Sequence, residues 1–127
     1  MEAFYKIHEY LLTHTEATVR RELMAEIDWN DRLIGIKGTR GVGKTTFLIQ
    51  YAQERFRGDR SCLYVNMNNL YFQGKSLTAF AEEFIRRGGK VLLIDQVFKI
   101  PNWSHQLREC YDRFPQLKMV FTGTSVM

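Results

Sequence analysis

Short apolar runs alternate along this chain with longer segments in which apolar residues recur every three or four positions. Four runs have the length and composition of buried strands: 33–37, 62–65, 91–94 and 117–122. Between them, helical spacing predicts three helices: 43–56, 76–87 and 101–114. Strands that alternate with helices across short loops predict an α/β fold, with a parallel sheet and right-handed crossovers.

The N-terminal residues predict helices that precede this alternation. Residues 3–12 place four side chains on one helical face: Phe4, Ile7, His8 and Leu11. A second helix is predicted from Thr15, as its N-cap, to about Asp28, with an inward face of Val19, Leu23 and Ile27. We therefore divide the chain into an N-terminal helical segment, residues 1–29, and a core domain, residues 30–127.

A glycine-rich segment follows the first predicted strand. It reads Gly38-Thr39-Arg40-Gly41-Val42-Gly43-Lys44-Thr45 and fits G-x-x-x-x-G-K-[ST], the phosphate loop of P-loop NTPases. Such a loop points backbone N–H groups at a polyphosphate, and glycine permits the positive φ and close approach that this needs. We expect these residues and Thr46 to bind a nucleoside triphosphate, with Lys44 on the β- and γ-phosphates and Thr45 on Mg²⁺.

The run 91–94 ends in a carboxylate, Asp95. Apolar residues followed by Asp describe a Walker B strand, which in a parallel sheet brings the carboxylate beside the phosphate loop. We expect Asp95 to hold the Mg²⁺ shell through water. The alternative is a buried strand that happens to end in an ordinary aspartate.

Four stretches together resemble the prokaryotic AAA-type ATPases that are often fused to a nuclease-like C-terminal domain: 38–46, 93–95, Ile100-Pro101-Asn102-Trp103 and Thr122-Gly123-Thr124-Ser125. The resemblance covers most of residues 15–127. It implies a three-layer P-loop NTPase fold with strand order 5-1-4-3-2, and Mg²⁺-dependent ATP hydrolysis. It also implies that Thr122 senses the γ-phosphate, with Thr124 and Ser125 as alternatives, although a plain strand-ending turn explains these residues equally well.

The chain stops after the fourth predicted strand, so the fifth strand is missing. The first strand then has an unpaired edge, which a free domain needs to cover. We expect this to be the front part of a longer protein, in which a C-terminal domain or a neighbouring subunit lies against that edge.

One position departs from the family pattern. The family normally has Asp-Glu at the end of this strand, whereas the chain has Asp95-Gln96. The glutamate acts on the attacking water, and a neutral amide can orient that water but cannot take its proton. We expect weak hydrolysis with ATP binding retained, whether Gln96 was introduced to trap the ATP state or is native to a binding switch.

Two other functions are weighed against this ATPase. One is a non-catalytic nucleotide-binding regulator, in which ATP organises an interaction surface. The other is a small P-loop kinase, for which no arginine-bearing lid or acceptor pocket is found before Met127. Four arginines are candidates for an arginine finger by residue type alone, and surface ion pairing is the preferred role for each: Arg86, Arg87, Arg108 and Arg113.

Composition adds limits to the partners. A net charge of +4 is compatible with nucleic acid or with a polyphosphate ligand, and DNA binding is not inferred from it.

Cys62 and Cys110 lack metal-site spacing and predict buried free thiols in a reducing cytosol. For His8 and His14, a capping or surface role is preferred over metal binding. No stretch has the apolar length of a membrane span, so we expect a cytoplasmic protein without a membrane partner.

The segment 69–74 resembles the recognition site of a protease used to remove purification tags, except that Asn68 stands where that site has Glu. We interpret it as a native loop whose Tyr71 and Phe72 pack on the core, and we assign it no chemistry.

Overall fold

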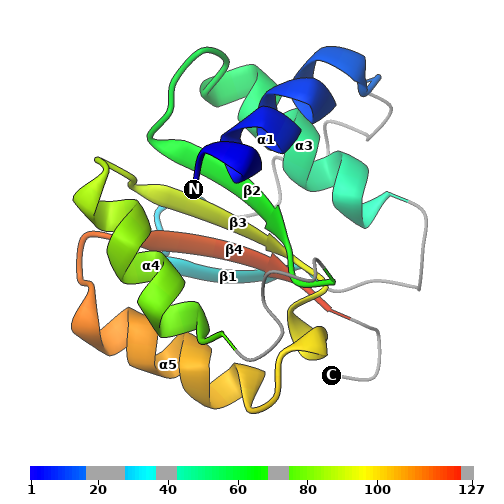
Figure 1. Cartoon of the computed structure of the whole chain (residues 1–127). Helices are drawn as coiled ribbons and strands as arrows, with labels where there is room; N and C mark the ends of the chain where they lie inside the picture. The colour runs from blue at the N-terminus through cyan, green and yellow to red at the C-terminus, as the bar shows by residue number, and fades with distance from the viewer. Residues whose placement is uncertain (17–27, 37–42, 69–74, 124–127) are drawn as a thin grey trace.

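The computed structural model describes residues 1–16, 28–36, 43–68 and 75–123. Its helices are α1 (Glu2–His14), α3 (Lys44–Arg55), α4 (Leu77–Arg86) and α5 (Trp103–Arg113), with a 3-10 helix, η2 (Val97–Lys99). Its strands are β1 (Leu33–Ile36), β2 (Cys62–Asn66), β3 (Val91–Asp95) and β4 (Lys118–Thr122). They form a four-stranded sheet in the order β1-β4-β3-β2, with every neighbouring pair parallel (Figure 1). The predicted α/β class and order of these strands are confirmed.

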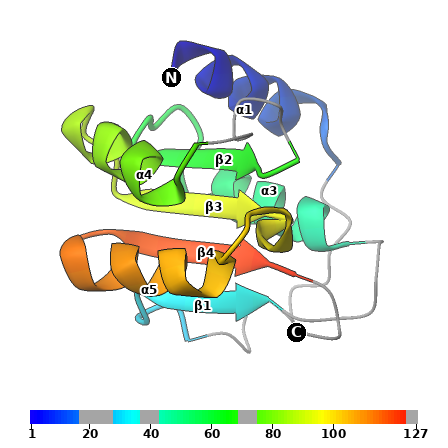
Figure 2. The ribbon, with the colours of Figure 1, turned by 60° about the horizontal axis from the view of Figure 1, so that its bottom comes forward.

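The sheet separates two layers of helices. Helices α4 and α5 lie on one face and α3 lies on the other, while α1 runs beside β2 (Figure 2). Side chains alternate between the faces along each strand, as the pleat requires. The face toward α3 therefore carries alternate residues of every strand: Ile34, Ile36, Cys62, Tyr64, Val91, Leu93 and Val120.

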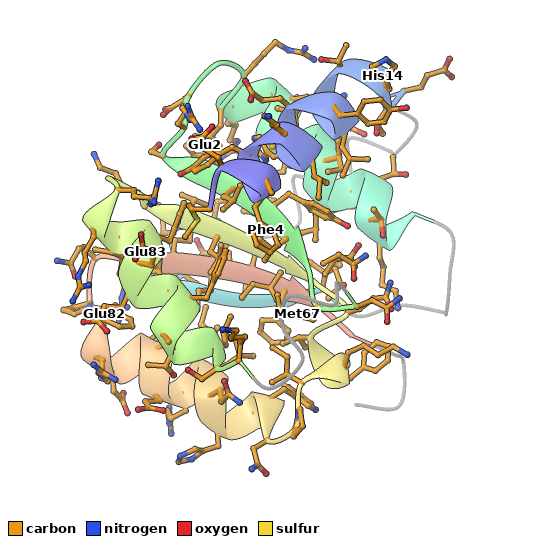
Figure 3. The ribbon with its side chains drawn as sticks, viewed as in Figure 1. Glu2, Phe4, His14, Met67, Glu82 and Glu83 are labelled. Carbon is orange, nitrogen blue, oxygen red and sulfur yellow. The ribbon has the colours of Figure 1, made fainter. Side chains whose placement is uncertain are left out.

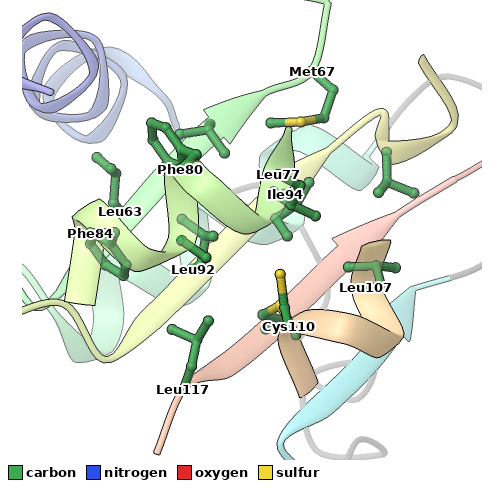
Figure 4. Packing of buried hydrophobic residues seen from close by; sticks show 14 of the residues in the cluster. Leu63, Met67, Leu77, Phe80, Phe84, Leu92, Ile94, Leu107, Cys110 and Leu117 are labelled. Carbon is green, nitrogen blue, oxygen red and sulfur yellow. The ribbon is translucent and has the colours of Figure 1, made fainter. Parts of the chain in front are cut away.

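The opposite face carries the other set of alternate residues, which packs against α4 and α5. Figure 4 shows Phe80 and Phe84 of α4 grouped with Leu63 and Leu92 of the sheet, with Cys110 of α5 lower in the same cluster. Because both faces are covered, the strands are mostly apolar, and β3 is buried at all of its positions.

The buried face of α1 differs from the one predicted. Its buried residues are Phe4, Tyr5, His8 and Leu12, whereas Ile7 is 43% exposed and Leu11 is only half-buried. The helix contacts both β2 and α3, and the Tyr5 hydroxyl donates a 2.9 Å hydrogen bond to the Arg60 carbonyl just before β2. Because of these contacts, the buried face of α1 is shifted by about one residue from the face predicted by the apolar spacing. Figure 3 shows Phe4 directed toward the sheet and His14 at the far end of the helix.

Local signals set the ends of α4 near their predicted positions. The Ser76 hydroxyl accepts a 3.0 Å hydrogen bond from the Ala79 N–H and caps the first turn. At the other end Gly88 has φ of +92°, and the Gly89 N–H donates to the Phe84 carbonyl at 2.9 Å. The helix predicted from Thr15 to Asp28 lies mostly outside the described residues, as do Tyr71 and Phe72.

Candidate functional site

The carboxyl ends of the parallel strands meet the start of α3 at one edge of the sheet (Figure 1). Asp95 ends β3, Thr122 ends β4, and α3 begins at Lys44. Open parallel sheets bind their ligands at this edge, because loops and helix N-termini gather there. Those predicted site residues that the structure describes are therefore separated in sequence but neighbours in space.

Asp95 is the centre of a cluster of hydroxyl groups. Its Oδ2 accepts hydrogen bonds from the Thr45 hydroxyl at 2.5 Å and from the Tyr64 hydroxyl at 2.6 Å, and its Oδ1 accepts one from the Thr122 hydroxyl at 2.6 Å. The carboxylate is only 2% exposed. A buried carboxylate is costly unless its oxygens are hydrogen-bonded, and these three donors supply that stabilisation.

The pleat and the first turn of α3 explain how these groups meet. Asp95 lies two residues after Leu93, and Thr122 two residues after Val120, so both point to the α3 face. Thr45 is the second residue of α3 and lies over that face. The sequence spacing between the glycine-rich segment and Asp95 does not reveal this contact, which depends on the packing of α3 against the sheet.

Tyr64 is a member of the cluster that sequence reasoning missed. We assigned 62–65 to a buried strand, and Tyr64 is indeed only 3% exposed. Its Cα pairs with that of Leu93 in the adjacent strand, two residues before Asp95, and the long phenol spans that distance along the sheet. Burial, reinforced by the charge of Asp95, raises the pKa of Tyr64 above its usual range, so the phenol remains a hydrogen-bond donor. A tyrosine near the carboxyl end of a neighbouring strand was the available signal.

The start of α3 has the geometry that suits an anion. Gly43 precedes the helix with φ of +106°, a left-handed conformation that glycine adopts without strain. Lys44 Nζ donates a 2.5 Å hydrogen bond to the Gly123 carbonyl at the end of β4. Thr46 follows in the first turn. The remaining residues predicted to bind phosphate, Gly38 to Val42, lie outside the described residues.

Gln96 directly follows the buried strand and turns the chain. Its backbone is left-handed, with φ of +55° and ψ of +47°, and η2 starts immediately afterwards. The Gln96 N–H donates a 3.1 Å hydrogen bond to the Thr122 hydroxyl. A left-handed conformation is uncommon for a residue other than glycine and is often found at functional sites.

The Thr122 hydroxyl both accepts and donates a hydrogen bond. It accepts from the Gln96 N–H and donates to Asp95, and the residue is 2% exposed. In this arrangement its proton is directed at Asp95. The hydroxyl would have to rotate in order to donate to a phosphate. The alternatives predicted for this role, Thr124 and Ser125, lie outside the described residues.

The oxygen groups at this edge fit a magnesium ion better than a softer metal. Thr45 is exposed and donates its proton to Asp95, which leaves its oxygen lone pairs for a cation. Mg²⁺ prefers such oxygen ligands and keeps several waters, so an aspartate engaged by three hydroxyls suits an outer position. Within the described ranges, no group of three or more His, Cys, Asp or Glu residues is arranged to hold a metal.

The two histidines of α1 differ in role, and the prediction of a capping or surface role for His8 is wrong. His8 is 4% exposed, and its Nδ1 accepts a 3.0 Å hydrogen bond from the Tyr64 N–H at the outer edge of β2. It is buried because α1 covers that edge, which the helix pattern alone does not predict. His14 is exposed and stacks on Tyr10.

The cysteines and surface arginines lie as predicted. Cys62 and Cys110 are buried free thiols, and burial raises both pKa values, that of Cys110 to about 11. Three of the candidate arginines form ion pairs one helical turn apart: Arg86 with Glu82, Arg87 with Glu83 and Arg113 with Glu109. Their side chains are exposed, and surface ion pairing is enough to explain why arginine is found at these positions.

A cavity of about 270 Å³ lies elsewhere, between α1 and the turn 57–60. Tyr5, His8 and Arg60 are among its lining residues, and none of the residues around Asp95 lines it. The site is therefore defined by the hydrogen-bonded cluster rather than by this hollow. None of the described helices has the length and apolar composition needed to cross a bilayer.

Comparisons with known proteins identify a family for this chain. A family model described as an AAA domain matches residues 30–127. No curated protein matches the chain. Among solved structures, C. elegans PCH-2 is similar at 21% identity and a TM-score of 0.47, over 94% of this chain and 35% of that one. The chain thus spans about a third of the length of that structure. Because the family model covers most of its residues, the chain belongs to the AAA domain family and is an ATPase-type module.

Proposed function

We propose that this chain binds ATP with Mg²⁺ through residues 38–46 and Asp95, and that it hydrolyses the nucleotide slowly because position 96 is Gln. The observation that carries the proposal is the 2.5 Å hydrogen bond from the Thr45 hydroxyl to Asp95 Oδ2. It joins the residue that ends the glycine-rich motif to the carboxylate that ends β3. Both are the residue types that hold magnesium beside a triphosphate.

The chain's own groups would act on the triphosphate in three ways. The first turn of α3, entered through Gly43, presents backbone N–H groups and the positive end of its dipole. Lys44 would exchange its bond to the Gly123 carbonyl for the β- and γ-phosphates. Thr45 would hold the metal directly and Asp95 would hold a water of its shell. When bound, Mg²⁺ neutralises the charge that develops on the transferred phosphoryl group.

Gln96 sets the proposed limit on turnover. Its position after Asp95 is the one from which a carboxylate would accept the proton of the attacking water. The amide has no negative charge, so it orients the water without lowering the barrier to proton loss. Nucleotide binding does not need this group and should remain.

Calorimetric titration with ATP, in Mg²⁺ or in EDTA, tests the binding proposal. Wild-type protein should bind ATP more tightly with Mg²⁺, and Thr45→Val should lose most of that difference. Thr13→Val is the matched control, because Thr13 lies on the exposed side of α1, where its hydroxyl donates to the Glu9 carbonyl. Failure of wild-type protein to bind ATP, or equal affinity with and without the metal, would refute the proposal.

A second candidate, the non-catalytic regulator, is favoured by Gln96 itself. In that case nucleotide binding organises a surface and no carboxylate is needed at position 96. Phosphate release from wild-type protein and from Gln96→Glu separates the two: an ATPase gains turnover, and a regulator shows none in either form. The small P-loop kinase is a weaker candidate, which phosphate transfer to a panel of acceptors would reveal.

The partner proposal concerns the outer edge of β1. Among the described strands, β1 pairs with β4 alone. We propose that a C-terminal domain, nuclease-like in related prokaryotic proteins, or a neighbouring subunit covers this edge. The cytoplasmic location and any contact with nucleic acid remain predictions.

A further inference from the structure

We infer that Tyr64 is a positioning residue for the metal-binding pair Thr45 and Asp95. Its phenol would hold Asp95 in the orientation that Mg²⁺·ATP binding requires. The inference rests on the proposed nucleotide function and adds to it a residue that lies outside the glycine-rich segment and outside β3.

The geometry begins with an oxygen that two hydroxyls share. Asp95 Oδ2 accepts from Tyr64 at 2.6 Å and from Thr45 at 2.5 Å. The carboxylate plane is thus determined by Tyr64 on one side and by Thr122, bonded to Oδ1, on the other. The direction in which the Thr45 oxygen presents its lone pairs depends on where Oδ2 is held.

The backbone of Tyr64 is held on both sides of β2, and its side chain is held by the core. Its backbone N–H donates to His8 Nδ1 at 3.0 Å, outside the sheet, and its Cα pairs with that of Leu93 inside the sheet. The side chain is 3% exposed and packs within the core cluster on the α3 face. A phenol held in this way has few alternative orientations, so it can fix the carboxylate rather than follow it.

The Tyr64 hydroxyl interacts with the side chains of Asn66 and Thr45 as well as with Asp95, so its partners all lie at this edge of the sheet. Removing it would leave the aromatic ring in the core, and Oδ2 would still accept from Thr45. The carboxylate would then be less constrained, since one of its three hydroxyl donors is gone. Groups that orient metal ligands affect metal affinity by about 10- to 100-fold in known sites, and because Tyr64 acts on Thr45 through Asp95 we expect the lower end of that range.

The test compares ATP affinity with Mg²⁺ and with EDTA in Tyr64→Phe, using calorimetry rather than turnover. We expect the ratio of the two dissociation constants to fall by about tenfold, with the affinity in EDTA nearly unchanged. Tyr51→Phe is the matched control, because Tyr51 is buried in the same cluster and stacks on Trp29 at 4.3 Å. A merely structural role would weaken binding in both conditions and leave the ratio unchanged.

A double-variant comparison adds a second criterion. In the Asp95→Asn background, Tyr64→Phe should cause no further change in the ratio, because the carboxylate that Tyr64 positions is absent. A further tenfold fall there would overturn the inference. An unchanged ratio in the single variant would also overturn it, provided that wild-type protein shows the Mg²⁺ effect. If wild-type protein shows no Mg²⁺ effect, the proposed function itself fails and the inference fails with it.

If Tyr64→Phe does not fold, a variant that keeps the hydroxyl can be tested instead. Here 3-fluorotyrosine replaces tyrosine at position 64 only, or at position 51 only as the control. The more acidic phenol donates a stronger hydrogen bond and alters the charge left on Asp95. A ratio that changes about twofold or more at position 64 and not at position 51 supports the inference, and equal ratios overturn it.

Discussion

His8 Nδ1 accepts a 3.0 Å hydrogen bond from the backbone N–H of Tyr64. Among the described strands, β2 has no neighbour on its outer edge, and at this point a side chain of α1 supplies the acceptor that a neighbouring strand would provide. An acceptor nitrogen must be unprotonated, so this contact exists only with neutral His8. The relationship makes the stability of the domain depend on pH.

Acid should destabilise the fold through His8. Burial lowers the pKa of His8 below the usual 6.5, so the unfolded chain binds the proton first as the pH falls. The contribution is fully present above about pH 6.5 and is lost below it, by up to about 1.4 kcal/mol per pH unit for one proton. Urea unfolding between pH 7.5 and 5 measures this slope.

The control for this prediction replaces the ring by an amide. His8→Asn keeps an acceptor oxygen in place of Nδ1 but has no proton to bind, so the slope below pH 6.5 should become shallower. His14→Asn should leave the slope unchanged, since His14 is exposed. Identical slopes in wild type and His8→Asn would contradict the assignment.

Lys44→Ala should abolish measurable ATP binding. The side chain already reaches the carbonyl of Gly123 at the same edge of the sheet as Asp95 and supplies a full positive charge there. Its removal takes away the positive charge that attracts the triphosphate, and we expect a loss of affinity of about 100-fold or more, as for charged hydrogen bonds of about 3 kcal/mol. Equilibrium dialysis with labelled ATP measures it, and Lys99→Ala, an exposed residue of η2, serves as the control.

Gln96→Glu should raise the rate of phosphate release. A carboxylate at this position can accept the proton of the attacking water, and general base groups typically contribute about 10²- to 10⁴-fold. The affinity for ATP should change much less than the turnover. A coupled phosphate assay on the purified chain, and on any longer form of the protein, measures the gain. No release in either form would show that position 96 does not limit turnover.

Gly89→Ala should destabilise the domain by about 1–3 kcal/mol, as overpacking of a core does. A Cβ at this position would lie 2.4 Å from the ring of Phe84, which is fully buried and cannot move aside. Thermal unfolding followed by circular dichroism measures the loss. Ala79→Gly, on the exposed side of α4, is the comparison variant, and it should lower the free energy of unfolding by a similar amount without a steric clash. A Gly89→Ala protein as stable as wild type would show that the α4 turn relaxes.

The sequence alone determined the type and order of the main elements. Strong apolar runs such as 91–94 and helices with clear stripes and caps, such as the one that starts after Ser76, depend on local periodicity and local hydrogen bonds. It also determined which residues end the strands, so Asp95 and Thr122 were expected at one edge of a parallel sheet. Alternation of strand and helix restricts the connections to this topology.

Only the tertiary structure decided which face of α1 is buried and which side chains surround Asp95. The apolar stripe of α1 favoured Ile7 and Leu11, but contacts with β2 and α3 buried Tyr5 and Leu12 in their place. The Tyr5 hydroxyl bonds to the Arg60 carbonyl just before β2, and His8 bonds to the Tyr64 N–H of β2. Tyr64 reaches Asp95 only through the pairing of β2 with β3. A pattern along one chain carries periodicity, whereas register and packing angle between elements arise when distant segments meet.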